Sequence, residues 1–164
     1  MNFPRALLHE PLTAEQEQAW GNFAAWPDAT FFPSFVGLVV EEPRQDYARM
    51  RLPYRPELDQ PHGLVHGGAI ATLIDTVVVP AIGAAYPDRR PFATIDMQIR
   101  YLAAVVRQDI VAEGWVTRRG RSIVFLDVEV TLPGGDVCAT ATLTYKVGRP
   151  PTGSRPDAEP TRTE

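Results

Sequence analysis

The fold is decided by the stretch Gly63-Leu64-Val65-His66-Gly67-Gly68-Ala69-Ile70-Ala71-Thr72-Leu73-Ile74-Asp75, a glycine-bearing turn that leads into an apolar segment. Asp75 is the only charged residue between His66 and Asp88. A lone carboxylate among apolar side chains is costly to bury unless something uses or neutralises it. Helix starts that carry glycines offer free backbone N–H groups, which can hold an anion or a developing oxyanion. The stretch therefore combines a group that can activate a carbonyl with a candidate base or nucleophile.

The apolar segment from Gly67 to Ala85 is expected to form a buried helix. Val77-Val78-Val79 favours a strand, and Pro80 is poorly tolerated inside a helix. However, the segment runs for about 19 residues without alternation, which is longer than typical strands. We therefore predict a helix, kinked or ended near Pro80, that other elements must wrap because it is apolar all round.

Strands and a further helix flank this segment. A first helix is predicted to begin at Thr13, a residue suited to N-capping, and to continue through Trp20 to about Trp26. Alternating or β-rich patterns predict strands at residues 35–41, 46–52, 94–102, 109–118, 122–132 and 137–147. The last four are expected to form an antiparallel meander, closed by a hairpin turn at residues 133–136. The fold class is therefore α+β, with a sheet curled around a central helix.

Composition limits the classes of function. The chain has 164 residues, a formal charge of −4, and hydrophobic and charged contents of 45% and 22%, so one domain with a sizeable core is expected. An acidic protein is a poor general nucleic-acid binder, and the broken apolar segment 69–85 is too short to span a membrane. With Cys138 as its one cysteine the chain cannot form an internal disulfide, and no secretory signal is recognisable at the N-terminus, so a cytoplasmic location is predicted.

The chain resembles the hotdog-fold thioesterases of the phenylacetic-acid-degradation, or PaaI-like, type. The resemblance covers roughly residues 35–147 and rests on Gly63-x-x-His66-Gly67-Gly68, on the spacing of Asp75, on the strand 93–102 and on Arg118-Arg119-Gly120-Arg121-Ser122. It implies an N-terminal helical extension at 1–34 and a hotdog domain at 35–147. Residues 148–164 are rich in Pro, Gly, Ser, Thr and charged residues, which predicts a disordered tail.

The resemblance also implies an activity, the hydrolysis of acyl-coenzyme A thioesters without a metal or other cofactor. The backbone N–H of Gly67 would polarise the thioester carbonyl, and Asp75 would act as nucleophile or as general base on water. Gln60 stands where many members carry Asn; a branch that acts on aromatic acyl-CoA uses Gln there but pairs it with Glu, so aromatic and aliphatic substrates both stay open. The substrate-binding residues implied are His66, Gly68, Thr94, Arg100, Arg118, Arg121 and Ser122.

Spacing points independently to a site shared between subunits. Gly67 and Asp75 are eight residues apart in the sequence, which is about 12 Å along a helix. Oxyanion donor and attacking group must both lie within about 3 Å of one reacting centre. Two antiparallel copies of the helix can meet this requirement where one cannot, so a homodimer is predicted; the resemblance adds a tetramer of two dimers.

Structural readings compete with these roles. Asp75 can instead cap a loop or pair with Arg, and His66 can order its turn rather than act as a base. Each Arg can belong to a solvated strand end with carboxylate partners. The aromatic residues Trp20, Trp26, Phe31 and Phe32 can cover an acyl pocket or belong to the core. Among functions, the alternative is a non-catalytic acyl-CoA sensor. An enoyl-CoA hydratase ranks last because such enzymes carry a His five residues after the Asp, where this chain has Pro80.

Overall fold

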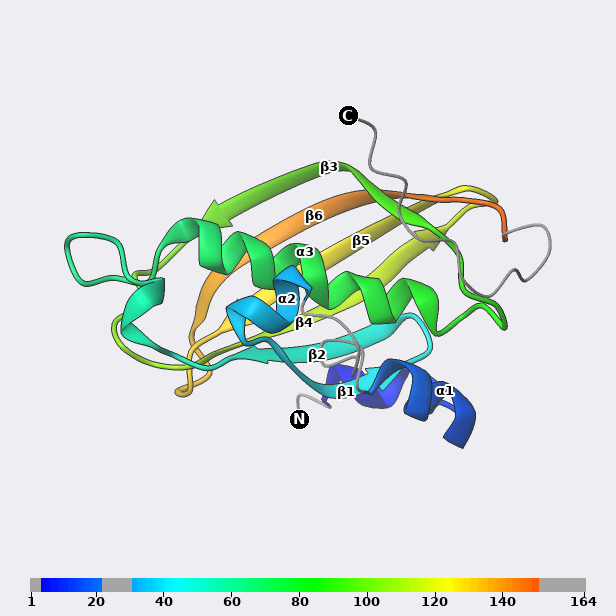
Figure 1. Ribbon diagram of the computed structural model, residues 1–164, viewed down its shortest axis with the longest axis horizontal. Helices are drawn as coiled ribbons and strands as arrows, with labels where there is room; N and C mark the ends of the chain where they lie inside the picture. Colours follow the sequence, from blue (N-terminus) through cyan, green and yellow to red (C-terminus); the bar gives the residue numbers. More distant parts are fainter. Residues whose placement is uncertain (1–3, 22–30, 151–164) are drawn as a thin grey trace, which may run out of the picture.

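The computed structural model describes residues 4–21 and 31–150, and its centre is a long helix lying against one face of a curved sheet (Figure 1). Helix α3 spans Gly67–Gly83, and the strands are β1 (Val39–Arg44), β2 (Tyr47–Leu52), β3 (Phe92–Tyr101), β4 (Ile110–Arg119), β5 (Ile123–Thr131) and β6 (Val137–Val147). The shorter elements are η1 (Arg5–Leu8), α1 (Ala14–Trp20), α2 (Phe32–Val36) and η3 (Pro56–Leu58). The predicted α+β class, with a sheet curved around a central helix, is confirmed.

Helix α3 forms despite its strand-like valines because its side chains fill the concave side of the sheet. The prediction of a helix is confirmed, and Pro80 lies inside it rather than at its end. On β4, Gly114 allows the closest approach of helix and sheet, since a Cβ there would lie 3.0 Å from Val77 Cγ1 and 3.2 Å from Val78 Cγ1. The fully buried members of α3 are Leu73, Ile74, Val77, Val78, Ala81 and Ile82.

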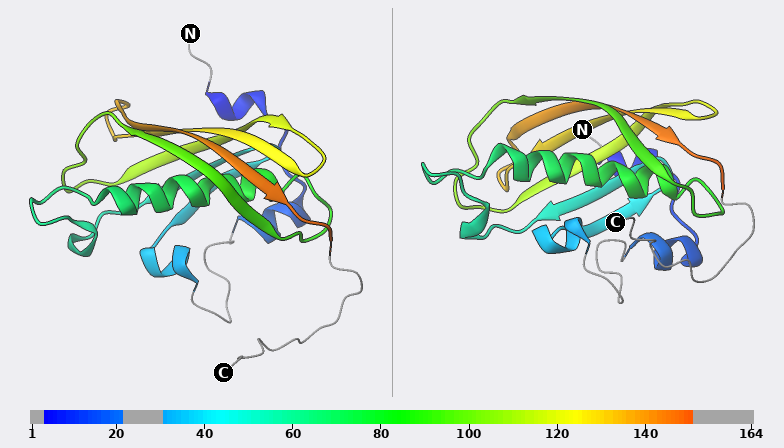
Figure 2. Two further views of the ribbon diagram at one scale, coloured as in Figure 1. Left: turned by 90° about the horizontal axis from the view of Figure 1, so that it is seen from above. Right: turned by 45° about the horizontal axis from the view of Figure 1, so that its top comes forward.

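The strand order is β1-β2-β4-β5-β6-β3, and all neighbours are antiparallel. The predicted meander is right for β4-β5-β6 but wrong for β3, which pairs with β6 and not with β4. The connection after β3 instead crosses the start of α3, where the Val65 N–H donates to the Val105 carbonyl over 2.9 Å. Strand β3 therefore forms one border of the sheet, as Figure 2 shows.

The strand predicted at residues 35–41 is partly wrong. Residues Phe32–Val36 form helix α2, and the strand begins only at Val39. Pro33 lies in the first turn of this helix, and Gly37 ends it in the left-handed region with φ 88°. These residues are the usual start and stop signals of a helix, but a short apolar run fits a strand equally well.

Helix α1 begins as predicted, with Thr13 as N-cap in a capping box with Gln16. Its Gln16 side chain also reaches the end of α3, where Nε2 donates to the Ala84 carbonyl over 2.8 Å. The helix ends at Trp20 with Gly21 as its C-cap, so the prediction of one helix running to about Trp26 is wrong at that point. Residues 22–30 and the predicted disordered tail from residue 151 onward lie outside the described residues.

Candidate active site

The start of α3 leaves one backbone N–H open. Gly68 N–H donates to His66 Nδ1 over 2.8 Å, and the N–H groups of Ala69 and Ile70 both bond the His66 carbonyl. The Gly67 N–H has no acceptor within the described ranges 4–21 and 31–150. Because the first N–H groups of a helix attract negative charge, Gly67 presents the donor that an oxyanion needs. His66 orders the turn, with its accepting Nδ1 already engaged.

A pocket of about 390 Å³ adjoins this N–H, and Gly67, Gln60 and Tyr101 share its lining. The Tyr101 hydroxyl donates to the Gly67 carbonyl over 2.9 Å. The Gln60 carboxamide oxygen accepts a hydrogen bond from the His62 backbone N–H over 2.9 Å. This contact uses the oxygen of the amide and not its NH₂ group. The structure thus brings two of the three predicted catalytic residues to one pocket.

Asp75 lies further along α3, half-buried, and its carboxylate is held by two hydroxyl groups. Thr94 Oγ1 donates to Asp75 Oδ1 over 2.9 Å, and the Tyr145 hydroxyl lies 2.5 Å from the same oxygen. Thr94 on β3 and Tyr145 on β6 are directly opposite each other in the sheet. The pairing of these two strands therefore places both hydroxyl groups beside α3. Both hydroxyls contact Oδ1, whereas Oδ2 has no hydrogen bond or ion pair in the described part of the chain.

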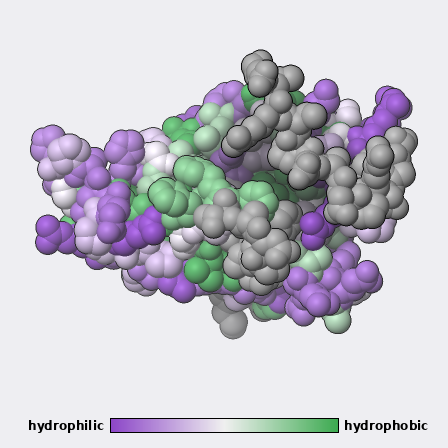
Figure 3. Space-filling model, in the orientation of Figure 1, coloured by the Kyte–Doolittle hydropathy of each residue, from purple (hydrophilic) through white to green (hydrophobic). Residues whose placement is uncertain are grey.

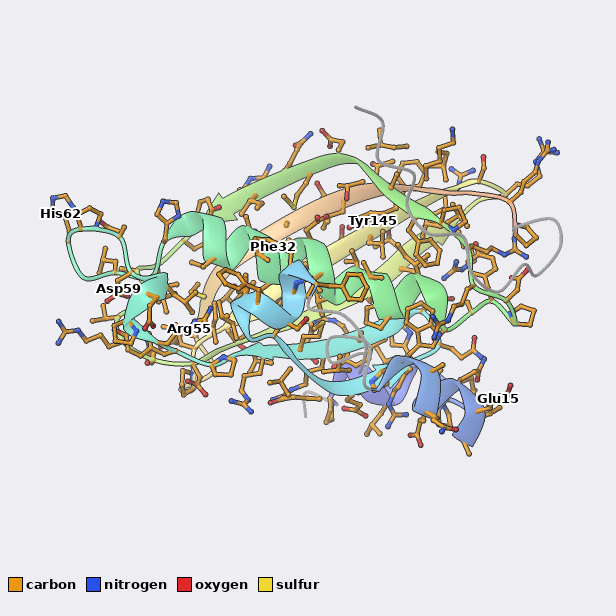
Figure 4. The ribbon with its side chains drawn as sticks, in the orientation of Figure 1. Glu15, Phe32, Arg55, Asp59, His62 and Tyr145 are labelled. Atoms are coloured by element: carbon orange, nitrogen blue, oxygen red, sulfur yellow. The ribbon has the colours of Figure 1, made fainter. Side chains whose placement is uncertain are left out.

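Tyr145 is the site residue that the sequence did not reveal. Its ring is buried between β6 and α3 (Figure 4), and burial, together with the hydrogen bond to Asp75, raises the pKa of its hydroxyl well above the ordinary value. The group therefore stays protonated and remains a donor at any physiological pH. Strand alternation places Tyr145 on the buried face, but its partner is 70 residues away in sequence, and no local pattern marks that contact.

Removal of the Tyr145 hydroxyl is expected to loosen Asp75. A hydrogen bond to a charged group contributes about 1.5–3 kcal/mol, so Tyr145→Phe should lower kcat about tenfold or more, with little change in KM. Tyr47→Phe is the matched control, because the Tyr47 hydroxyl is as deeply buried and lies 2.5 Å from Glu113, away from this site. The melting temperature should fall in both variants, but kcat should fall only in Tyr145→Phe. Equal kcat values in the two variants would remove Tyr145 from the site.

The two halves of the candidate site are separate within one chain. Gly67 and Asp75 lie on the same helix, and their spacing of eight residues corresponds to about 12 Å along its axis. Gly67 contacts Tyr101 at one end of β3, and Asp75 contacts Thr94 near the other end. An oxyanion held at Gly67 is therefore out of reach of Asp75 in the same subunit.

Four of the predicted substrate-binding residues also fall into two groups. Arg100 lies near the Tyr101 end of β3, while Arg118, Arg121 and Ser122 surround the β4–β5 turn at the end where β3 begins. All four are exposed, and the three arginines have no ion pair among residues 4–21 and 31–150. The neighbouring Arg119 is engaged by Asp46 and by the Tyr86 hydroxyl, so it fits the structural reading.

The described residues offer no metal centre, no ion pair to Asp75 and no helix suited to a membrane. No three His, Cys, Asp or Glu side chains there lie close enough together to hold a metal ion. Asp75 takes part in no ion pair within the described segments, which argues against the reading of this carboxylate as an Arg partner. None of the helices that the structure describes has the length and apolar character needed to cross a membrane.

Comparison with known proteins identifies the family. Residues 62–139 match the Thioesterase superfamily. A Halobacterium salinarum protein named as a candidate esterase is 35% identical over 114 residues, 66% of this chain and 75% of that protein. Human acyl-coenzyme A thioesterase 13 is 33% identical over 70 residues, which are 42% of this chain and 49% of the human protein.

Solved structures show the same fold. The PaaI protein from the phenylacetic acid degradation operon of E. coli superposes with a TM-score of 0.72, covering 82% of this chain and 96% of its own, and at 16% identity this shows the fold alone. The conserved protein PA5202 of Pseudomonas aeruginosa gives a TM-score of 0.68 at 25% identity over 73% of this chain and 94% of its own. The chain therefore belongs to the thioesterase superfamily, has its hotdog fold and is a thioester-hydrolysing enzyme.

Proposed function

We propose that this enzyme hydrolyses the thioester of a small-chain, medium-chain or aromatic acyl-coenzyme A to the free acid and coenzyme A. The observation that carries the proposal is the pairing on one helix of an open N–H at Gly67 with an oriented carboxylate at Asp75. Binding alone needs neither group, which argues against a non-catalytic sensor. A thioester is also an activated carbonyl with a good leaving group, so its hydrolysis needs few catalytic groups and little acid assistance to the leaving sulfur.

The geometry supports a simple sequence of events. The Gly67 N–H stabilises the negative charge that develops on the carbonyl oxygen. Asp75 uses Oδ2, the oxygen without a hydroxyl donor, either to attack the carbonyl carbon or to take a proton from an attacking water. If Asp75 attacks, the C–S bond breaks to leave an anhydride between Asp75 and the acyl group; water then hydrolyses this anhydride to the free acid, which restores the carboxylate and supplies the proton of the thiol. If Asp75 acts as a base, water attacks the carbonyl carbon directly, the C–S bond breaks, and the sulfur leaves with the proton that Asp75 removed. Gln60, beside Gly67, positions the water or the leaving sulfur through its amide.

Assembly through β3 would bring the two halves together. This strand is one of the two borders of the sheet, and its exposed residue Ile95 is 55% accessible. An unpaired strand edge is a template for pairing with another chain. Antiparallel pairing of two β3 strands, centred between Met97 and Gln98, would place Thr94 opposite Tyr101 of the second copy. Each Asp75 would then face the Gly67 of its neighbour, giving two equivalent sites per homodimer.

The shared site can be tested with mixed dimers. A Gly67→Pro subunit and an Asp75→Asn subunit are each expected to be inactive as homodimers, because each lacks one half of both sites. Their heterodimer, purified with two different tags, should recover about half of the wild-type kcat, since one intact site is rebuilt. A heterodimer as inactive as both parents would show that each subunit works alone.

Further parts of the proposal depend on this dimer. Pairing through β3 would bring Arg100 of one subunit closer to Arg118, Arg121 and Ser122 of the other, where guanidinium groups can hold the phosphates of coenzyme A. A tetramer of two dimers, the cytoplasmic location and the domain boundaries at residues 34 and 147 stay predictions.

The activity itself is tested by thiol release from a panel of acyl-CoA esters, with Asp75→Ala as the reference variant. We expect turnover by the wild-type enzyme and its loss in the variant. Tight binding of the esters without release of thiol would favour the sensor instead.

A further inference from the structure

A second pocket, of about 490 Å³, lies between α1 and the connection from α3 to β3, with Val79 of α3 in its lining. Its volume is typical of small-molecule sites, which span about 300–1,000 Å³. We propose that this pocket receives the distal end of the acyl group and that Trp20 forms its end wall, so that Trp20 limits the length of the acyl chain. This inference rests on the proposed function. The apolar part of the lining comprises Ala19, Trp20, Val79, Tyr86, Pro87 and Phe92.

Two lining residues of the pocket, Val79 and Phe92, are close in sequence to the candidate acid and its partner Thr94. Val79 follows Asp75 by four residues on α3, so both side chains lie on the same face of the helix, about 6 Å apart along its axis. Phe92 precedes Thr94 by two residues on β3, so the two side chains lie on the same side of the strand. The register shift of β3 falls only after Thr94 and does not affect this relation. A thioester carbonyl held at Asp75 therefore has this pocket one helical turn away.

The chemistry of the lining selects an acyl group rather than the nucleotide part of coenzyme A. The rim carries Glu15 and Asp88 as well as Arg89 and Arg90, so its charges balance. The Arg90 guanidinium is bonded to the Asp88 carboxylate over 2.7 Å and stacks over Tyr86. A site for the diphosphate would need an excess of available positive charge. An alkyl or aryl group needs only the apolar walls.

Trp20 is held firmly enough to act as a wall. Its ring lies against Phe92, with centroids 6.4 Å apart, and it packs directly on Gly83, where an added Cβ would come within 2.1 Å of the indole. The bond from Gln16 to the Ala84 carbonyl fixes the same helix to the end of α3. Of the aromatic residues suggested by the sequence, Trp20 lines this pocket, Phe31 and Phe32 do not, and Trp26 lies outside the described residues.

The experiment compares kcat/KM across saturated acyl-CoA esters from two to sixteen carbons. Each further methylene that can be buried is worth roughly fourfold in affinity, so Trp20→Ala should raise kcat/KM for the longer esters at least tenfold relative to acetyl-CoA. Trp20→Leu should give an intermediate shift and guards against loss of folding in the smaller variant. Phe125→Ala, an exposed aromatic change on β5 away from this pocket, should leave the profile unchanged.

A second variant changes the contact between Trp20 and Gly83 from the side of Gly83. Gly83→Ala improves the local helix propensity but displaces the indole, so it should change kcat/KM for long esters relative to acetyl-CoA. If both variants alter all esters by one common factor, the pocket does not hold the acyl group and the inference fails. The proposed function fails separately, if the wild-type enzyme hydrolyses no ester of the series.

Discussion

Asp75→Asn should abolish most of the thioesterase activity while leaving the fold intact. The amide has the same shape as the carboxylate, and its oxygen can still accept from Thr94 and Tyr145. What is lost is the negative oxygen that we propose attacks the carbonyl or removes a proton from water. Groups in such roles contribute about 10²–10⁴-fold to the rate, so kcat should fall by that factor with KM changed little.

The measurement is thiol release at saturating acyl-CoA, with thermal melting as the check on folding. Asp136→Asn, in the exposed β5–β6 turn, is the matched control and should keep full activity. An Asp75→Asn enzyme that retains a tenth or more of the wild-type kcat would exclude the carboxylate from the chemical step.

Gly67→Pro should be nearly as damaging, because it removes the one N–H that α3 leaves open. Proline is tolerated at the first position of a helix, and the residue before it must be extended. His66 already has φ −61° and ψ 134°, so the exchange asks little of the backbone. Loss of one oxyanion donor costs roughly 10²–10³-fold in kcat.

Gly67→Ala separates this loss from the effect of added bulk. It keeps the N–H, and its Cβ would lie 3.4 Å from the Tyr101 ring, an ordinary contact distance. Its kcat should stay within a few-fold of the wild-type value in the same thiol-release assay. Equal losses in the Pro and Ala variants would mean that Gly67 matters for space and not for its N–H.

Much of the candidate site follows from the sequence because its signals are local. The glycines before an apolar run mark the helix start, and the isolation of Asp75 in that run marks it as the candidate acid. The spacing between Gly67 and Asp75 also carries the argument for two subunits, since helix geometry depends on residue number alone.

What the sequence did not predict depends on contacts between distant parts of the chain. The position of β3 beside β6 is decided by a connection that crosses the start of α3, and alternation within a strand carries no information about neighbours. The Tyr145 contact with Asp75 arises from the same pairing. Helix α2, by contrast, could have been predicted from local residues, because Pro33 and Gly37 mark the two ends of a helix. The exposed Phe32 and Phe35 contribute to its apolar surface (Figure 3).

The close packing at Gly114 means that a substitution on β4 can affect the position of α3. A methyl group at that position would have to displace Val77 and Val78 by a few tenths of an ångström. Because Gly67 and Asp75 both belong to α3, such a push would act on the candidate donor and the candidate acid together. A mutation on the sheet, in contact with neither of these two residues, would thereby disturb both halves of the candidate site.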